Sequence, residues 1–288
     1  MKCKICGKNA EIQAFGMWLC RDCFLKLFFR RVNKILKKYW HGEKIWVALS
    51  GGKDSMALLH YLWENGYPVH GYHINLGIGD YSRSVEDIIR SYTEELGVEL
   101  LITNLREEYG FSIGEIRRKP CSACGTVKRY LMNKVPRENG AEILVTGHNM
   151  DDFLEFFIKN MLGKNYSWSR KLVPYLEREH PKLLPKLRPF YLVGDKEIEI
   201  YAKLKGVKYI KENCPLAKLS GWKEILYEIE KKKKNFRYEM ILSVWEMAYF
   251  FPQEKREIRE CKLCGEPTSR DICSFCTLRM RYGKKSTG

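Results

Sequence analysis

The sequence predicts an α/β protein in which a doubly wound parallel sheet is flanked by two small four-cysteine modules, one near each end of the chain. Three observations lead to this fold class: strands alternate with helices through the middle of the chain, a glycine-rich loop joins one strand to the next helix, and paired CxxC motifs stand near both ends. We divide the chain into 1–26 (N-terminal module), 27–43 (linker helix), 44–220 (α/β domain), 221–257 (helical extension) and 258–288 (C-terminal module).

Short apolar runs mark the predicted strands, which lie at 44–49, 69–74, 99–103 and 142–146. Such runs suit strands that are buried on both faces of a sheet. Apolar residues at helical spacing predict helices at 54–63, 85–96, 222–229 and 240–251, and another that starts near Thr126.

The composition points to a polyanion as a macromolecular partner. Lysine and arginine number 51 against 35 acidic residues, so the net charge is +16. Positive charge binds nucleic acid through phosphate contacts and counterion release, although a solvated lysine-rich surface explains the charge equally well. Glutamine occurs only at Gln13 and Gln253 while lysine and glutamate are abundant, a bias that resembles hyperthermophile proteins.

We expect a cytoplasmic protein that does not associate with membranes. No stretch reaches the roughly 18 apolar residues of a membrane span, and Met1 leads directly into a cysteine motif without an apolar leader. In that compartment eleven cysteines indicate metal ligation or redox chemistry rather than disulfides.

The loop SGGKDS at 50–55 follows a predicted strand and precedes a predicted helix. Glycines let the backbone approach phosphates closely, and a helix N-terminus presents unpaired N–H groups with a favourable dipole. Ser50 and Ser55 add hydroxyl donors, Lys53 is a candidate phosphate cation, and Asp54 is a candidate magnesium ligand or helix cap. The motif is not the G-x4-G-K-[ST] loop, and its position disfavours a tight turn with coincidental glycines. We predict that ATP binds here.

The rest of this site follows from topology, because ligands bind at the carboxyl ends of parallel strands. The strand at 69–74 ends at Ile74, and the strand at 142–146 leads into Gly147, which permits close approach of a ligand. Asp151 and Asp152 form a pair that could hold Mg²⁺. A lone histidine is more often structural, so we assign His148 no catalytic role.

Eight cysteines form two sets of paired CxxC motifs near the chain ends: Cys3, Cys6, Cys20 and Cys23, and Cys261, Cys264, Cys273 and Cys276. Two CxxC turns complete a tetrahedral four-thiolate site, so we predict two structural Zn²⁺ ions that supply folding energy to these short segments. Basic residues beside the sites suggest RNA contact as an added role: Lys2, Lys4, Lys8, Arg21, Arg270, Arg279, Arg281, Lys284 and Lys285.

Three cysteines remain in the middle of the chain, namely Cys121, Cys124 and Cys214. Three ligands suit a cubane iron–sulfur cluster with one free iron, and zinc with an open position is also possible. Persulfide and disulfide chemistry without a cluster is a second explanation, and inert burial is a third. The spacing does not decide between cluster and persulfide. Lys128 lies one helical turn after Cys124, where a solvated surface lysine is the simpler explanation.

Several motifs occur together and in order: the N-terminal CxxC pairs, SGGKDS, PCSACG-x2-K, GHNxDD, ENCP and the C-terminal CxxC pairs. In this combination the chain resembles the tRNA 2-thiouridine synthetases of the TtuA type and their wobble-uridine relatives, which belong to the TtcA-like group of the PP-loop ATP pyrophosphatase superfamily. The resemblance covers essentially the whole chain. It implies a PP-loop ATPase domain between the two zinc fingers.

The resemblance implies a reaction and its residues. ATP adenylates the C2 oxygen of a tRNA uridine, and sulfide from a ubiquitin-like carrier with a C-terminal thiocarboxylate replaces that oxygen. Cys121, Cys124 and Cys214 would hold a [4Fe–4S] cluster, and Lys128 and Asp152 would be the catalytic or ATP-positioning pair. The implied ATP-binding set is Ala48, Ser50, Gly51, Gly52, Lys53, Asp54, Ser55, Ile74, Lys128, Gly147 and Asp152.

The resemblance is imperfect after GHNxDD, where this chain has an aromatic segment from Phe153 to Asn165. That segment leaves the target uridine open. The thermophile-like composition favours the T-loop uridine over the wobble uridine. A PP-loop ligase with a nitrogen nucleophile would not need three central cysteines, and a catalytically silent tRNA-binding paralogue would not need an intact SGGKDS loop. The resemblance is also compatible with a homodimer joined through the zinc regions.

Overall fold

A six-stranded sheet forms the centre of the computed structural model, which describes residues 1–217, 220–253 and 257–283. The strand order is β5-β4-β3-β6-β8-β7, with bounds β3 Ile45–Leu49, β4 Val69–Asn75, β5 Leu100–Asn104, β6 Ile143–Thr146, β7 Tyr175–Leu176 and β8 Lys186–Leu187. All pairs are parallel except β7 with β8 at the edge. The four predicted strands are therefore confirmed, whereas β7 and β8 are too short to give a sequence pattern.

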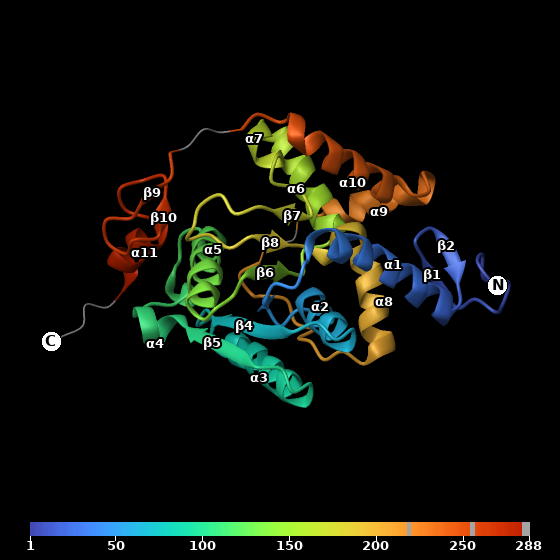
Figure 1. Ribbon diagram of the computed structural model, residues 1–288, viewed down its shortest axis with the longest axis horizontal. Helices are drawn as coiled ribbons and strands as arrows, with labels where there is room; N and C mark the ends of the chain where they lie inside the picture. The colour runs from blue at the N-terminus through green and yellow to red at the C-terminus, as the bar shows by residue number, and fades with distance from the viewer. Residues whose placement is uncertain (218–219, 254–256, 284–288) are drawn as a thin grey trace.

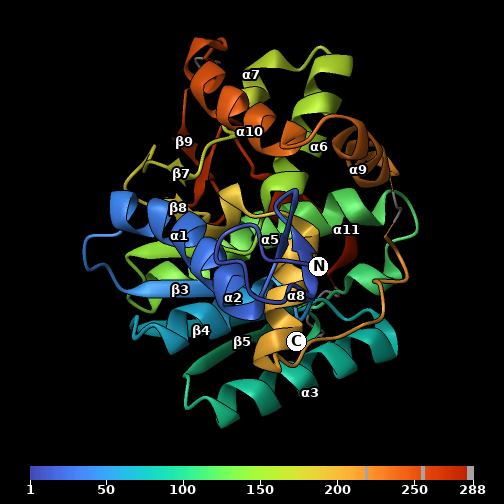
Figure 2. The ribbon, with the colours of Figure 1, turned by 90° about the vertical axis from the view of Figure 1, so that its right-hand side faces the viewer.

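Alternate residues of β3 pack into two different cores. Ile45, Val47 and Leu49 belong to one buried cluster, and Trp46 belongs to the other. The first cluster lies under α1 (Arg21–Tyr39), α2 (Lys53–Glu64), α3 (Gly79–Glu95) and α8 (Asp195–Lys205). The second lies under α4 (Leu105–Tyr109), the 3-10 turn η1 (Ile113–Glu115) and α5 (Pro120–Glu138). Helices thus cover both faces, as the alternation predicted (Figure 2).

A group of helices extends the fold beyond the β7–β8 edge (Figure 1). It contains α6 (Met150–Leu162), α7 (Tyr166–Ser169), η2 (Pro189–Leu192), α9 (Trp222–Lys232), α10 (Phe236–Met247) and η3 (Ala248–Phe250). The helix predicted at 240–251 starts four residues earlier and ends in a 3-10 turn. The helix predicted to start near Thr126 starts at Pro120, a residue that fits the first turn of a helix because it has no N–H to leave unpaired. Cys121 and Cys124 therefore lie on the helix, not before it.

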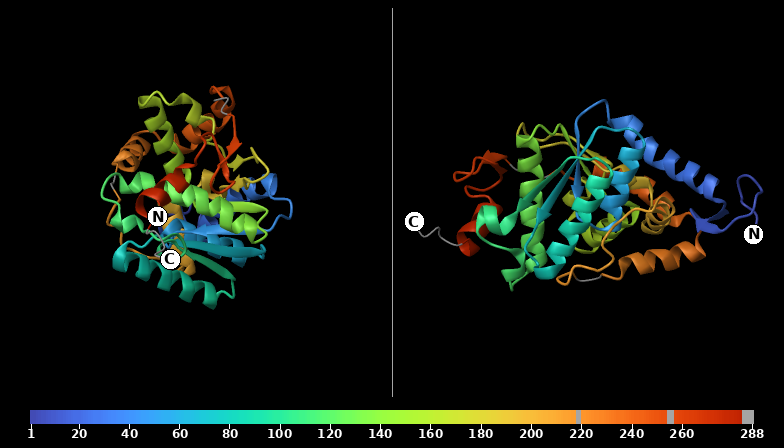
Figure 3. Two further views of the ribbon diagram at one scale, coloured as in Figure 1. Left: turned by 90° about the vertical axis from the view of Figure 1, so that its left-hand side faces the viewer. Right: turned by 90° about the horizontal axis from the view of Figure 1, so that it is seen from below.

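The two four-cysteine modules lie at opposite ends of the long axis of the molecule (Figures 1 and 3). The N-terminal module is the hairpin β1 (Ile12–Ala14) and β2 (Met17–Leu19) followed by α1, and the C-terminal module is β9 (Arg259–Glu260), β10 (Pro267–Thr268) and α11 (Ser274–Tyr282). Phe275 of α11 stacks on Tyr130 of α5 at a centroid distance of 3.9 Å, which anchors the C-terminal module to the second core.

No helix among the described residues is long and apolar enough to cross a membrane.

Candidate functional site: a phosphate loop beside three cysteines

The SGGKDS loop lies between β3 and α2, as predicted, and two glycines shape it. Gly51 has φ +75°, and a side chain there would meet Val85 Cγ1 at 2.7 Å. Gly147, after β6, packs against the start of α2, where a Cβ would lie 2.8 Å from the backbone carbon of Asp54. Within the loop, the amide of Ser50 donates to the hydroxyl of Ser55 at 3.1 Å. The loop is thus pre-shaped at a helix N-terminus, the geometry of an anion site.

Lys53 and Asp54 face a carboxylate from a distant part of the chain. Lys53 Nζ lies 2.6 Å from Asp54 Oδ1 and 2.9 Å from Asp195 Oδ1, at the start of α8. Burial raises the pKa of the Asp54 carboxyl to about 6 against the charge of Lys53, and the carboxylates of Asp195 and Asp152 raise it further. Carboxylate oxygens of this kind are the ligands that Mg²⁺ takes in phosphate sites.

Asp152 lies near enough to act on the charge of Asp54 and is itself held by two groups. Its Oδ2 accepts from the amide of Asn149 at 3.0 Å in a capping box that starts α6, and its Oδ1 lies 2.7 Å from Lys223 Nζ. Lys223 also lies 3.3 Å from Asp195 Oδ1. Lysines 53 and 223 therefore neutralise part of a cluster of three carboxylates. The predicted site did not include Asp195 or Lys223. Asp195 belongs to the segment Gly194-Asp195-Lys196-Glu197, which supports the family resemblance, but neither residue has a local signal that places it beside Lys53.

Asp151 does not share the position of Asp152. It is fully buried, and both of its carboxylate oxygens accept from Arg237 Nη1, at 2.9 and 3.0 Å. It also accepts from the hydroxyl of Tyr227 at 2.8 Å. These partners, together with the amide of Asp195 at 2.8 Å, engage Asp151 inside the core, which favours Asp152 over Asp151 as the Mg²⁺ ligand of the suggested pair. Asp151 therefore links α6 to α9, which carries Tyr227, and to α10, which carries Arg237.

At the end of β4, His73 and Ile74 are buried and Ala48 of β3 is half-buried. His73 Nδ1 lies 2.9 Å from the carbonyl of Leu49, so this nitrogen carries the proton and Nε2 is an acceptor. Among the described residues nothing pairs with that buried Nε2. An unpaired acceptor at the carboxyl end of a parallel strand is suited to a donor on a bound ligand.

The three central cysteines come from two elements that the structure brings together. Cys121 and Cys124 lie on the first turn of α5, and Cys214 lies in the loop after α8. Cys121 Sγ donates to the carbonyl of Leu216 at 3.1 Å, which fastens this loop to the helix. The same loop reaches the phosphate loop, since the amide of Ile210 donates to the carbonyl of Gly51 at 2.9 Å.

Lys128 lies one turn after Cys124 on α5. Burial raises the pKa of the Cys124 thiol, the Lys128 cation lowers it, and the thiols of Cys214 and Cys121 raise it. Lys128 also contributes to lowering the pKa of His73, after burial as the main cause. The charge of Lys128 therefore acts on both the cysteines and the strand ends beside the phosphate loop.

The two kinds of cysteine site differ in sulfur spacing. In each terminal module the four sulfurs all lie within 4.8 Å of one another, with Cys6 and Cys20 3.6 Å apart and Cys264 and Cys273 3.8 Å apart. Zn–S bonds of about 2.3 Å in a tetrahedron place sulfurs just under 4 Å apart, so each module fits one metal ion. The three central sulfurs do not form such a group. Wider spacing fits a cubane cluster, whose iron–sulfur core lies between its cysteine ligands.

Of the basic residues beside the modules, Lys2, Lys4, Lys8, Arg21, Arg270, Arg279 and Arg281 are exposed. Lys284 and Lys285 lie outside the described residues. The lysine run at 231–234 is exposed as well.

A model of the PP-loop domain family matches residues 25–219. The tRNA-5-methyluridine(54) 2-sulfurtransferase of Pyrococcus horikoshii is 38% identical over 96% of this chain and 93% of its own length. The enzyme of the same name from Thermus thermophilus is 35% identical over 96% of this chain and 91% of its own length. The chain belongs to the PP-loop family and, within it, to the TtuA-type tRNA sulfurtransferases.

A solved relative in this family carries a cluster. The U34-tRNA thiolase NcsA of Methanococcus maripaludis, solved with its [4Fe–4S] cluster, is 27% identical, with a TM-score of 0.84 over 99% of this chain and 98% of its own. In this TtuA-type chain the aromatic segment after GHNxDD is divided between core and surface. Phe153, Leu154 and Phe157 of α6 are buried, whereas Phe156 and Leu162 are exposed. Much of the segment is thus explained by packing.

Proposed function

We propose that this enzyme is a tRNA uridine 2-sulfurtransferase that activates the uridine C2 oxygen with ATP and replaces it with sulfur. The observation that carries the proposal is the segment from Ile210 to Leu216. It is hydrogen-bonded to Gly51 of the phosphate loop at one end and to Cys121 at the other, and it contains Cys214. A nucleotide site and a thiol site are thus adjacent, as a reaction that joins adenylation to sulfur delivery requires.

The proposed reaction has two steps. The C2 oxygen of the uracil attacks the α-phosphorus of ATP, the bond to the β-phosphate oxygen breaks, and pyrophosphate leaves. Sulfide then attacks C2, and the C2–O bond breaks with AMP as the leaving group. The first step converts an oxygen that leaves poorly into a phosphate ester that leaves readily. ATP supplies the activation, so no oxidant or reductant is needed.

We assign different parts of this reaction to residues in and around the phosphate loop. The phosphate loop and Lys53 bind the triphosphate, while Asp54 and Asp152 are the proposed carboxylates for Mg²⁺. His73 Nε2 and the strand end at Ile74 face the proposed adenine position. Lys128 stabilises negative charge that develops on the phosphate or the uracil oxygen. Asp195 and Lys223 position Lys53 and Asp152 through the ion pairs described above.

Cys121, Cys124 and Cys214 are the proposed ligands of a [4Fe–4S] cluster. When bound, such a cluster supplies an iron with a free coordination position for inorganic sulfide. The protein holds the three thiols through the first turn of α5 and the contact between Cys121 and Leu216. In the terminal modules the sulfur spacing supports two Zn²⁺ ions.

The T-loop uridine at position 54 is the proposed target, because the sulfurtransferases named above carry that position in their names at 35–38% identity. The wobble uridine is the second candidate, since NcsA is described as a U34 thiolase at a high TM-score. A ubiquitin-like carrier with a terminal thiocarboxylate is the proposed sulfur donor. A homodimer joined through the zinc regions remains part of the proposal.

Mass spectrometry of tRNA digests tests the proposal most directly. Anaerobically prepared enzyme incubated with tRNA, ATP and sulfide should yield 2-thiolated uridine at position 54 and one pyrophosphate per sulfur. Cys121→Ser should yield neither thiolated uridine nor the broad visible absorbance of a cluster, while its zinc content stays at two per chain. A thiolation rate equal to wild type in Cys121→Ser rules out the cluster mechanism, and a product at position 34 assigns the second target. If wild-type enzyme binds tRNA but releases no pyrophosphate, the silent paralogue is the better explanation.

A further inference from the structure

A cavity lies between α5 and the C-terminal module, on the side of α5 that carries Ser122 and Thr126. Its volume is about 350 Å³, and its walls come from the loop before α5, the first two turns of α5 and one face of α11. Four of its lining side chains are cationic: Arg118, Lys119, Arg270 and Arg281. None of the lining residues is acidic.

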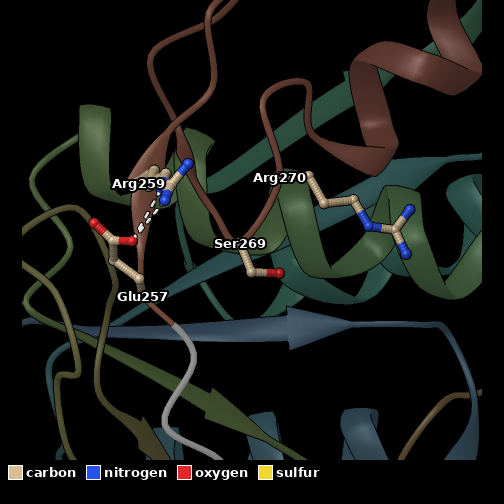
Figure 4. A pocket seen from close by; sticks show the side chains of 4 residues that line it. All are labelled: Glu257, Arg259, Ser269 and Arg270. Atoms are coloured by element: carbon tan, nitrogen blue, oxygen red, sulfur yellow. Dashed lines mark hydrogen bonds and ion pairs between the residues drawn. The ribbon is translucent and has the colours of Figure 1, made fainter.

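These four cations have no acidic partner within the part of the chain that the structure describes. By contrast, Arg259, which lies in the C-terminal module with Arg270 and Arg281, pairs with Glu257. Figure 4 shows a neighbouring pocket lined by Glu257, Arg259, Ser269 and Arg270, in which the Arg259 guanidinium meets the Glu257 carboxylate and the Arg270 side chain extends away from them. Four unpaired cations around one cavity repel one another, so a polyanion that enters relieves the repulsion. Arginine is well suited to this because its planar donors match phosphate oxygens.

The remaining polar groups of the cavity favour a phosphate over a metal or an apolar ligand. The hydroxyls of Thr126 and Thr277 already donate to backbone carbonyls one turn back, at 3.2 and 3.1 Å. Ser122 and Ser274 lie on the first turns of α5 and α11, so two helix N-termini open toward the same space. The aromatic contact of Phe275 with Tyr130 holds the two walls together.

The position of the cavity ties it to the cysteine site. Ser122 lies between Cys121 and Cys124 in the sequence, so the cavity borders the start of the helix that carries both thiols, although Ser122 and Cys124 point to nearly opposite faces of that helix. We propose that this cavity binds a phosphodiester of the RNA substrate. The proposal rests on the function proposed above and assigns the cavity to RNA rather than to an acidic protein partner.

Charge reversal at Arg270 tests the assignment in the full-length enzyme. Arg270→Glu should weaken tRNA affinity about tenfold and lower the slope of log affinity against log salt by about one, as expected when a phosphate contact is lost. Arg259→Glu is the matched control, because it makes the same charge change in the same module outside the cavity. It should change affinity by about twofold or less, since its effect acts only through screened long-range charge. Fluorescence anisotropy of labelled tRNA at several salt concentrations gives both values.

Arg118→Glu probes the opposite wall, outside the metal module, so its effect does not depend on folding of that module. It should reproduce the loss, and Arg270→Lys should restore part of the affinity. Equal tRNA affinity in Arg270→Glu, Arg118→Glu and the Arg259→Glu control would overturn the inference. Unchanged tRNA affinity with slower thiolation from a protein sulfur donor, but not from inorganic sulfide, would also overturn it and assign the cavity to that protein. A wild-type enzyme that binds tRNA through these arginines but does not thiolate it refutes the proposed function and leaves the RNA cavity in place.

Discussion

The two terminal modules and the central cysteine site use the same side chain in opposite ways. In each module four sulfurs lie within 4.8 Å of one another, and backbone amides point at them, as Cys273 N does at Cys261 Sγ at 3.2 Å. The central site has three thiols from two elements, one of which, Cys121, is exposed. A closed set of four ligands leaves no position for a reactant, whereas three thiols beside a nucleotide loop leave one. Because Cys6 of the N-terminal module is exposed as well, the two kinds of site differ in the number and spacing of their sulfurs rather than in exposure.

The two terminal modules are also attached to the rest of the protein in different ways. The C-terminal module is held by aromatic stacking and by Arg137, whose Nη2 lies 2.6 Å from Glu266 Oε1. The N-terminal module is held through a buried charge network, in which Glu197 Oε1 accepts from the amide of Phe15 at 3.1 Å and lies 3.7 Å from Arg237 Nη2. That network also contains Asp151, the neighbour of Asp152. The N-terminal module is therefore coupled to the start of α6.

The largest expected effect is the loss of a terminal ligand. Cys276→Ser should remove one zinc per chain and unfold the C-terminal module, because structural zinc contributes about 10–16 kcal/mol to folding of such small sites. Metal analysis and limited proteolysis of the module read out the change. Cys121→Ser is the matched variant in the open site and should leave both readouts unchanged. Full zinc content in Cys276→Ser would contradict the closed-site assignment.

Arg237→Met should lower the free energy of unfolding by about 3–5 kcal/mol, because it leaves the fully buried Asp151 carboxylate without its cation. Denaturant unfolding measures this. Arg259→Met, at an exposed ion pair, is the control and should leave the free energy of unfolding close to that of wild type. A loss below 1 kcal/mol in Arg237→Met would show that the N-terminal module does not depend on the buried network.

Lys128→Ala should lower the thiolation rate by about 10²–10³-fold, the usual cost of removing a group that stabilises charge in the transition state. The zinc content and the free energy of unfolding should match wild type, because Lys128 has no buried ion pair among the described residues. Single-turnover thiolation with saturating ATP measures the chemical step separately from ATP binding and product release. A rate within threefold of wild type would show that Lys128 is a solvated surface lysine with no catalytic role.

The sequence was sufficient for features with a local signature and insufficient for those made by distant segments. The strand at 44–49, the glycine loop and the eight terminal cysteines could be predicted because each has a fixed spacing that only a few structures satisfy. Asp195 and Lys223 could not, since only the fold places them beside Lys53 and Asp152. Asp151 and Asp152 are adjacent in sequence, yet Asp151 points into the core, where it pairs with Arg237, and Asp152 pairs with Lys223 beside the phosphate loop. Short strands such as β7 carry too few residues for a periodic pattern.

The smallest expected effect concerns the pH dependence of Asp54 in the phosphate loop. The folded-state pKa of Asp54 is raised from 3.8 to about 6, so folding favours its protonated form. Its contribution to stability is fully present below about pH 4 and is lost as pH rises toward 6. Relative to Asp54→Asn, wild-type enzyme should therefore lose stability between about pH 4 and 6 and show no further change up to pH 8. Mg²⁺–ATP should move this window to lower pH, because a nearby cation favours the carboxylate. Urea unfolding of both proteins at several pH values, with and without Mg²⁺–ATP, measures the window. If the difference in free energy of unfolding between wild type and Asp54→Asn stays constant from pH 4 to 8, the pKa of Asp54 is not raised by burial. That result would weaken the assignment of Asp54 to the magnesium position.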